Sequence, residues 1–225
     1  MSPIIRSKCF TCRDIVCFSN FAVLIYYEII KLDANHNHID HVFDRYFKNS
    51  LKEDTRKSRG STGCTFPFDD DTELPDDMVG TFTTNNDNKN ALNEYLAKKL
   101  IDLHQGSKLI ITTFKNSVLC SSNTDIDTSE VGVHSCQSEE ADQRLERHLL
   151  NCICGNKKYC LIFIRAFDTD VMILVVAFAS EYQNMCSNTK VCLHGEFQQN
   201  VKYLCYCQIS WKRYLPWSTF LLCSN

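Results

Sequence analysis

The stretch "YCLIFIRAFDTDVMILV", residues 159–175, joins two apolar runs through the acidic tripeptide Asp168, Thr169 and Asp170. The first run is short and rich in β-branched and aromatic residues, which predicts a buried strand. The second run continues to residue 182 and is apolar all round, which predicts a buried helix. A strand followed directly by a helix is typical of a mostly parallel α/β sheet.

The segments upstream extend this α/β pattern. Apolar side chains at a spacing of 3.6 residues predict three helices, over residues 18–32, 88–106 and 138–152. Residues 108–120 contain two β-rich runs around the polar pair Lys115 and Asn116, which predicts a hairpin. "HVFD", residues 41–44, predicts a short strand that ends in Asp44.

Polar segments lie between these elements. "ANHNHIDH", residues 34–41, predicts a polar turn, and residues 50–60 predict a helix with Ser50 as its N-cap and Gly60 as its stop. Residues 61–87 are rich in Gly, Thr, Asp, Asn and Pro and predict a long surface loop. Residues 121–137 predict a second polar loop. Loops of this length usually carry function or disorder.

Composition narrows the class of protein. The formal net charge of −3 means that any nucleic-acid contact would come from a local basic patch and not from the field of the whole chain. Fourteen cysteines among 225 residues stay below the roughly 8–10% that marks a disulfide scaffold, so we expect reduced thiols. The apolar residues 17–30 are too short to span a bilayer. We expect an intracellular protein, nuclear or cytoplasmic, with no membrane partner.

Acidic side chains recur where the predicted strands end and where one predicted helix starts. They are Asp44, Asp168 and Asp170 at strand ends and Glu139, Glu140 and Asp142 in "SEEADQRLERHL", residues 138–149. In an open α/β sheet these positions share one edge, at which ligands collect. Clustered carboxylates suit Mg²⁺ or Mn²⁺, and a pair of such ions can activate water for phosphodiester hydrolysis.

The same acids also have a simpler interpretation. Carboxylates are favoured at helix N-termini by the helix dipole, and Asp168 or Thr169 would make a good N-cap. Residues at i and i+2 do not share a helix face, so Glu140 and Asp142 could not both bind one ion without help from the first turn. The residues alone leave both interpretations open.

Four stretches together resemble one family. "HVFDRYFKNSLKEDTRKSRG", "NKNALNEYLAKKL", "CQSEEADQRLERHLLNC" and "IRAFDTDVMILVV" are similar, in order and spacing, to a group of uncharacterised, multicopy metazoan proteins with a PIN-like domain. That group is distantly similar to the flap endonuclease and asteroid nuclease class. The resemblance implies a Rossmann-like, PIN-like sheet flanked by helices over residues 18–182, after a poorly assigned segment 1–17.

Site residues follow from the same resemblance. Asp44 matches the acid at the class's "V-F-D" strand end, Glu140 and Asp142 match its acidic helix start, and Asp168 and Asp170 match its "D-x-D" motif. The resemblance implies catalytic roles for all five. It places Asp142, Asp168 and Asp170 closest to metal.

The chain departs from the family at both ends. Residues 1–18 offer only Asp14 for the acid that follows the class's first strand, and residues 183–225 lack the Asp of the group's final motif. The resemblance therefore implies a truncated or degenerate copy, incomplete at its C-terminal edge, with weak or no nuclease activity. A non-catalytic nucleic-acid- or protein-binding module, derived from the same mobile-element-like multicopy family, remains the alternative.

Two further clusters are candidate binding groups. Basic side chains follow Asp44 closely and would contact phosphates of DNA or RNA, or would form an ordinary solvated helix face: Arg45, Lys48, Lys52, Arg56, Lys57 and Arg59. The spacing of His148, Cys152, Cys154 and Cys160 could hold Zn²⁺, as could Cys9, Cys12 and Cys17 with a fourth ligand. Neither set has the paired C-x₂-C pattern, and we expect core residues.

Overall fold

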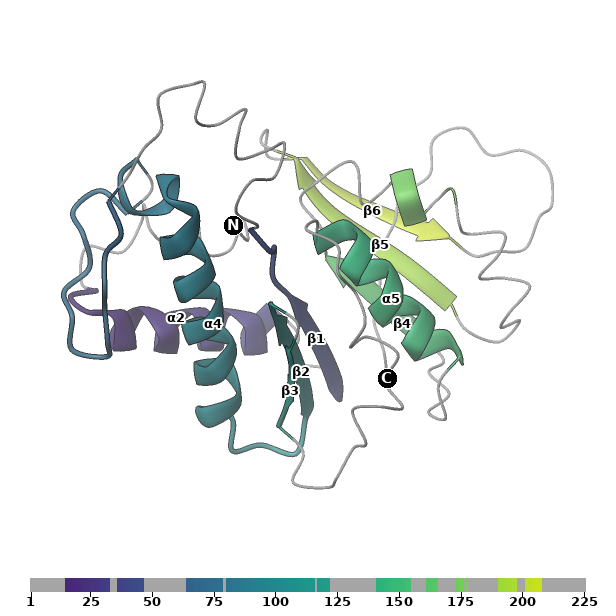
Figure 1. The fold of residues 1–225 in the computed structure, drawn as a ribbon. Coiled ribbons are helices and arrows are strands. Elements are labelled where there is room, and N and C mark those ends of the chain that lie inside the picture. The colour runs from purple at the N-terminus through teal and green to yellow at the C-terminus, as the bar shows by residue number, and fades with distance from the viewer. Residues whose placement is uncertain are drawn as a thin grey trace. The chain divides into compact units, whose positions relative to one another are not determined.

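The computed structural model describes ten helices and strands, shown in Figure 1. The described residues are 15–32, 36–46, 64–78, 80–115, 117–121, 141–154, 161–165, 173–175, 177, 190–197 and 201–207. They divide between two compact units. The first holds α2, most of β1, η1, α4, β2 and β3, and the second holds nearly all of α5 with β4, β5 and β6.

Helix α2 spans Phe18–Leu32, as the sequence predicts. The predicted apolar stripe is buried, with Phe18, Phe21 and Ile25 fully enclosed. The N–H groups of the first turn need acceptors outside the helix. The chain segment after residue 64 supplies them: Phe18 N–H donates to Thr72 O, and Ser19 N–H donates to Asp70 O, both at 3.1 Å.

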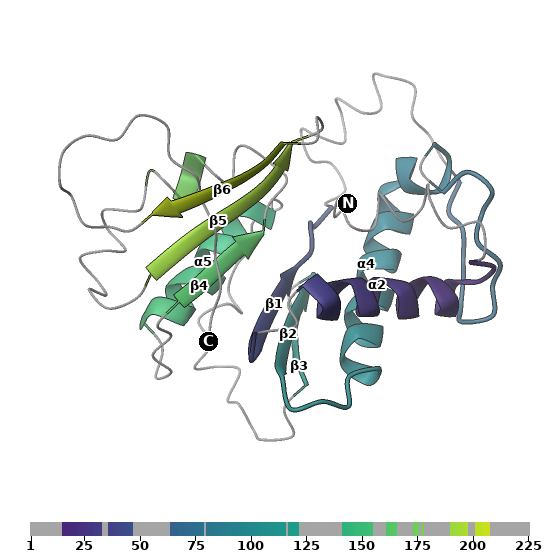
Figure 2. The ribbon, with the colours of Figure 1, turned by 180° about the vertical axis from the view of Figure 1, so that it is seen from behind.

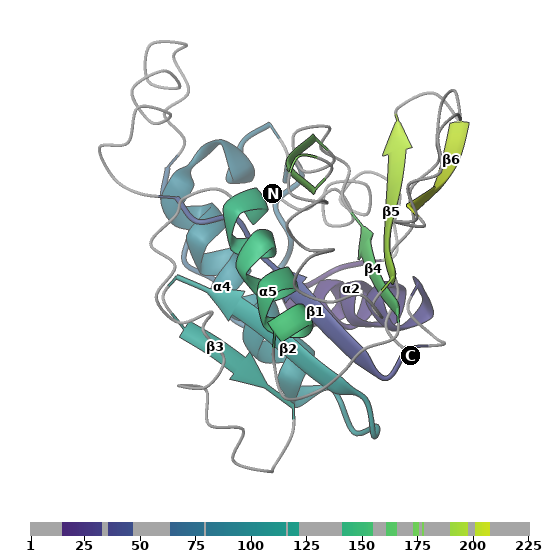
Figure 3. The same cartoon turned by 90° about the vertical axis from the view of Figure 1, so that its right-hand side faces the viewer.

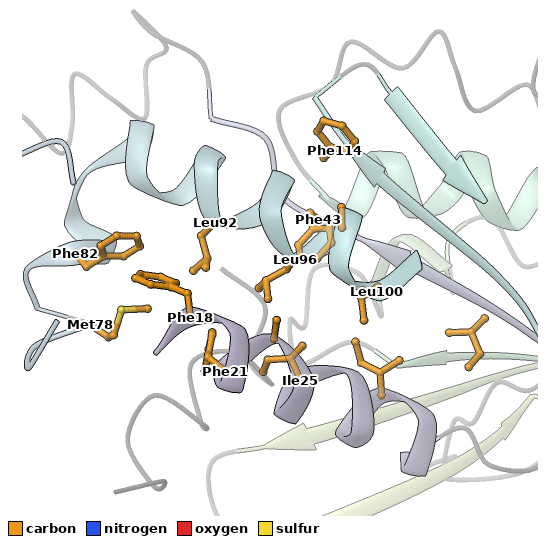
Figure 4. Packing of buried hydrophobic residues seen from close by; sticks show 14 residues of the cluster. Phe18, Phe21, Ile25, Phe43, Met78, Phe82, Leu92, Leu96, Leu100 and Phe114 are labelled. Carbon is orange, nitrogen blue, oxygen red and sulfur yellow. The ribbon is translucent and has the colours of Figure 1, made fainter. Parts of the chain in front are cut away.

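Helix α4 spans Asn86–Asp102 and packs across α2 (Figure 1). Its N-cap is Asn85, whose side chain accepts from the N–H groups of residues 87 and 88. Leu92, Leu96 and Leu100 recur at helical spacing and are at most 1% exposed. Figure 4 shows these leucines facing the apolar side of α2, so the sequence prediction of an amphipathic helix is confirmed.

The predicted surface loop 61–87 is packed more tightly than its composition suggests. The described part contains the short 3₁₀ helix η1, Phe82–Thr84, and aromatic rings that pack around Phe18. The centroids of Phe68 and Phe82 lie 4.0 and 5.6 Å from that of Phe18. The segment thus lies at the surface, as predicted, but Phe68 and Phe82 also pack onto the core, which its polar composition did not indicate.

Strand β1 spans His38–Val42, so the predicted polar turn over residues 34–41 was wrong in its second half. Ile39, His41 and Phe43 alternate along the chain, and Ile39 and Phe43 lie in the core. The polar residues His38 and Asp40 at the positions between, and His41 within the alternating set, hid this period of two. The strand ends before Asp44, which lies in the extended segment that follows.

The predicted hairpin is confirmed. Strands β2, Leu109–Phe114, and β3, Ser117–Cys120, pair antiparallel, and Lys115 adopts a positive φ of 49° in the turn. Strand β2 pairs on its other side with β1, in the order β1-β2-β3 (Figure 3). Ile110, Thr112 and Thr113 of β2 are completely buried.

The second unit contains helix α5, Ala141–Cys154, and a sheet of three strands in the order β4-β5-β6 (Figure 2). Strand β4, Leu161–Arg165, pairs parallel with β5, Lys190–Phe197. Strand β6, Val201–Cys207, pairs antiparallel with β5. The helix and β4 agree with the sequence predictions, whereas the β5–β6 hairpin was not predicted.

Residues 173–175 and 177 are helical, within the helix predicted after Asp170. Ile173 is 65% exposed, whereas Val175 is buried. The apolar sequence had suggested a helix buried on all sides, and the exposure of Ile173 shows that this was wrong. The predicted helix over residues 50–60 and the loop over residues 122–137 lie outside the described residues.

The mixed α/β class is confirmed. The described strands form two sheets of three, and both parallel and antiparallel pairings occur. The more specific prediction, a Rossmann-like fold of the PIN-like kind, stays a prediction.

Candidate functional site

Asp44 lies in the segment that follows β1, where the sequence analysis placed a catalytic acid. Its carboxylate Oδ2 accepts a hydrogen bond from the Tyr46 hydroxyl at 3.2 Å. The aspartate is half-buried, whereas the tyrosine is only 8% exposed. A buried tyrosine thus contacts a carboxylate that solvent can reach.

Helix α4 holds this segment by two side-chain amides. Asn90 accepts from the Tyr46 N–H at 3.2 Å and donates to the Tyr46 carbonyl at 2.7 Å. Asn93, which is 3% exposed, donates to the Asp44 carbonyl at 2.9 Å. Lys89 Nζ lies 4.8 Å from the centroid of the Tyr46 ring, a cation–π distance. The backbone of Asp44 and Tyr46 is therefore fixed to the first half of α4.

Sequence reasoning missed Lys89, Asn90, Asn93 and Tyr46. A signal was present in "NNDNKNALN", residues 85–93, because asparagine is a poor helix former and five of these nine residues are asparagines. Asparagines inside a helix are explained when their side chains form hydrogen bonds outside the helix, for example to a neighbouring loop. The sequence alone does not show which segment they bind.

The other predicted catalytic acids belong to the second unit or lie outside the described residues. Asp142 is the second residue of α5, at the start of the helix as predicted. Glu139, Glu140, Asp168 and Asp170 lie outside the described residues. By sequence, Asp168 and Asp170 come shortly after Arg165, the last residue of β4.

No three His, Cys, Asp or Glu side chains come together as a metal-binding group within the part of the chain that the structure describes. Of the five predicted catalytic acids, only Asp44 has a described side chain, so their grouping stays a prediction. Chemically the five are hard oxygen donors, which suit Mg²⁺ or Mn²⁺.

Of the predicted phosphate-binding residues, Arg45 is described and half-buried, next to Asp44. Lys48, Lys52, Arg56, Lys57 and Arg59 lie outside the described residues. Lys89 adds a basic side chain over the ring of Tyr46, the residue after Arg45, that the sequence prediction did not include.

The predicted zinc sets are described only in part. His148 and Cys152 are buried on α5, four residues apart in sequence, which agrees with core positions. Cys17 is a free thiol beside the first turn of α2 and donates to Asn20 Oδ1 at 3.0 Å. Hydrogen bonds with the Ser19 side chain and with the backbone of Asn20 lower the pKa of this thiol. The remaining predicted ligands, Cys9, Cys12 and Cys160, lie outside the described residues, and the Cys154 side chain is not described.

Comparisons with protein-family models, with curated proteins and with solved structures found no significant match to the chain. No helix among the described residues is both long and apolar enough to cross a bilayer.

Proposed function

We propose that this chain is a metal-dependent, nuclease-related domain protein of the PIN-like kind, which hydrolyses phosphodiesters weakly or has lost that activity. The supporting observation is the position of the acids along the secondary structure. Asp44 lies two residues after the end of β1, Asp142 lies in the first turn of α5, and the acidic pair Asp168 and Asp170 comes after β4 in the sequence. Acids at strand ends and helix starts are the arrangement expected at the ligand-binding edge of an α/β fold.

Each group has a role in this proposal. Asp44, Glu140, Asp142, Asp168 and Asp170 would hold Mg²⁺ or Mn²⁺, whose chemistry is to lower the pKa of water and to stabilise developing negative charge. Arg45, with Lys48, Lys52 and Arg56, would bind the phosphates of DNA or RNA without reading their sequence. Tyr46 donates to Asp44 Oδ2 and so restricts the orientation of the carboxylate.

A non-catalytic binding module inside the cell is the second candidate. The hydrogen bond between Tyr46 and Asp44 favours it, because that bond already uses one carboxylate oxygen for a contact within the fold. Arg45 and Lys89 would then make salt-dependent contacts to nucleic acid, with no metal required.

Cleavage of labelled single-stranded, flapped and RNA substrates in Mn²⁺ separates the two candidates. The test variants are Asp44→Asn and the double variant Asp168→Asn with Asp170→Asn, and the matched control is Asp102→Asn, at the end of α4. The nuclease proposal expects cleavage by the wild-type chain and the control, and its loss in both test variants. Absence of both cleavage and Mn²⁺-induced thermal stabilisation in the wild type would contradict it.

A further inference from the structure

Buried asparagines are an unusual feature of α4. Asn88 and Asn93 are 1% and 3% exposed, beside the apolar Leu92 and Leu96. Burying an amide without hydrogen bonds costs a few kcal/mol, and asparagine also disfavours the helix itself. These side chains must therefore be retained for the contacts that they make outside the helix.

The asparagines serve two different segments. Asn88 binds the segment before η1: it accepts from the Phe66 N–H at 2.8 Å and donates to the carbonyls of Cys64 and Phe82, both at 3.0 Å. Among the described residues, Asn90 and Asn93 bind the segment after β1, through Tyr46 and Asp44. One helix thus fixes two loops by separate sets of hydrogen bonds.

The contacts to the segment after β1 converge on Asp44. Asn93 holds its carbonyl, and Asn90 holds both backbone groups of Tyr46, so the chain is fixed on either side of Arg45. The Tyr46 ring, under Lys89, then brings its hydroxyl to the Asp44 carboxylate. Because the backbone of Asp44 is fixed, its carboxylate can move only by rotation about the side-chain bonds.

We propose that Asn90 and Asn93 are positioning residues, which fix the Asp44 carboxylate in the orientation that binds a divalent cation. This inference rests on the proposed function. Partners that orient a metal ligand typically contribute a factor of about 10–100 to metal affinity, because without them the ligand must be ordered during binding.

The test uses Mn²⁺ alone, with the full chain, and measures the dissociation constant by calorimetric titration and the melting temperature by circular dichroism. Asn93→Ala and Asn90→Ala remove the contacts to Asp44 and Tyr46. Asn88→Ala is the matched control, because it removes a buried amide of the same helix that contacts other residues. Asn90 is less buried than Asn93, so its variant tests the idea with less risk of unfolding.

We expect Mn²⁺ affinity to fall by about tenfold in Asn93→Ala and Asn90→Ala and to change less than about twofold in Asn88→Ala. All three variants should melt at lower temperature. Equal Mn²⁺ affinities in the wild type and the two test variants would overturn the positioning role but leave the proposed function standing. A wild-type chain that does not bind Mn²⁺ would overturn the proposed function, and this inference with it.

Discussion

The rings of Phe18 and Phe68 stack with centroids 4.0 Å apart and planes inclined by 19°. This contact joins the start of α2 to the described part of the long loop between β1 and α4. The loop backbone also supplies acceptors for the first N–H groups of the helix. A segment with a polar composition is therefore a structural part of the core.

Phe18→Ala should destabilise the first unit strongly. Phe18 is completely buried and contacts Phe66, Phe68, Phe82 and Tyr95. Removing a buried phenyl ring costs about 3–5 kcal/mol. Urea denaturation measures this loss, and Phe66→Ala is the control, since Phe66 is 37% exposed and should lose about 1 kcal/mol. Equal losses in the two variants would show that the aromatic cluster does not form around Phe18.

His41 should make the protein less stable in mild acid. Burial lowers its pKa to about 4, and Nδ1 has no hydrogen-bond partner among the residues that the structure describes. The ring centroid lies 4.4 Å from that of Phe43. Because the folded-state pKa lies below that of an unfolded histidine, the unfolded chain binds more protons between these values. This contribution to stability is complete above pH 6.5 and is lost as the pH falls toward 4.

The contribution of His41 to the free energy of unfolding should fall by about 2 kcal/mol. The full pKa shift corresponds to roughly 3 kcal/mol, and we expect less because the side chain is not completely enclosed. Denaturation at pH 7 and at pH 4.5 measures it, with His41→Gln as the comparison. The difference in unfolding free energy between wild type and variant should shrink by that amount at the lower pH. A difference that does not depend on pH would rule out the buried neutral histidine.

Lys115→Gly should stabilise the hairpin in high salt and have little effect in low salt. The positive φ of Lys115 costs about 1 kcal/mol for a residue with a Cβ atom. Lys115 also pairs with Glu94 at 2.5 Å, but both side chains are partly exposed, so the pair contributes less than about 1 kcal/mol and salt screens it. Thermal melts at two salt concentrations check the sign, and a variant less stable than wild type in 1 M salt would contradict this account.

Asp70→Asn should reduce the sensitivity of the first unit to acid. Hydrogen bonds from Lys99, at 2.6 Å, and from Tyr95, at 2.8 Å, lower the pKa of Asp70. The folded-state pKa lies below the unfolded one, so the contribution is present above the unfolded pKa and is lost as the pH falls through the folded one. Since the pair of Asp70 and Lys99 is partly exposed, we expect it to contribute about 0.5 kcal/mol to the free energy of unfolding at pH 7. Denaturation of both proteins at pH 7 and pH 3 measures it, and Asp71→Asn is the control.

Local sequence patterns were sufficient for several elements. Helix α2 has the predicted bounds, α4 follows its apolar spacing, and β2 and β3 form the predicted hairpin. In each, neighbouring residues of one segment carry the signal, because helix and hairpin hydrogen bonds close over a few residues. The position of Asp44 shortly after a strand, of Asp142 in the first turn of α5 and of a strand before Asp168 could be predicted for the same reason.

The contacts that hold these elements together were decided by the tertiary structure. The packing of Phe68 and Phe82 from a polar loop onto the core, the strand pairing of β1 and the β5–β6 hairpin depend on partners elsewhere in the chain. So does the attachment of Asp44 to Asn93 of α4, which no spacing rule connects. The sequence by itself determined where α2, α4 and the β2–β3 hairpin form and which acids come after strand-forming runs. Only the tertiary structure decided what fixes Asp44, because hydrogen bonds between distant segments depend on how the chain packs.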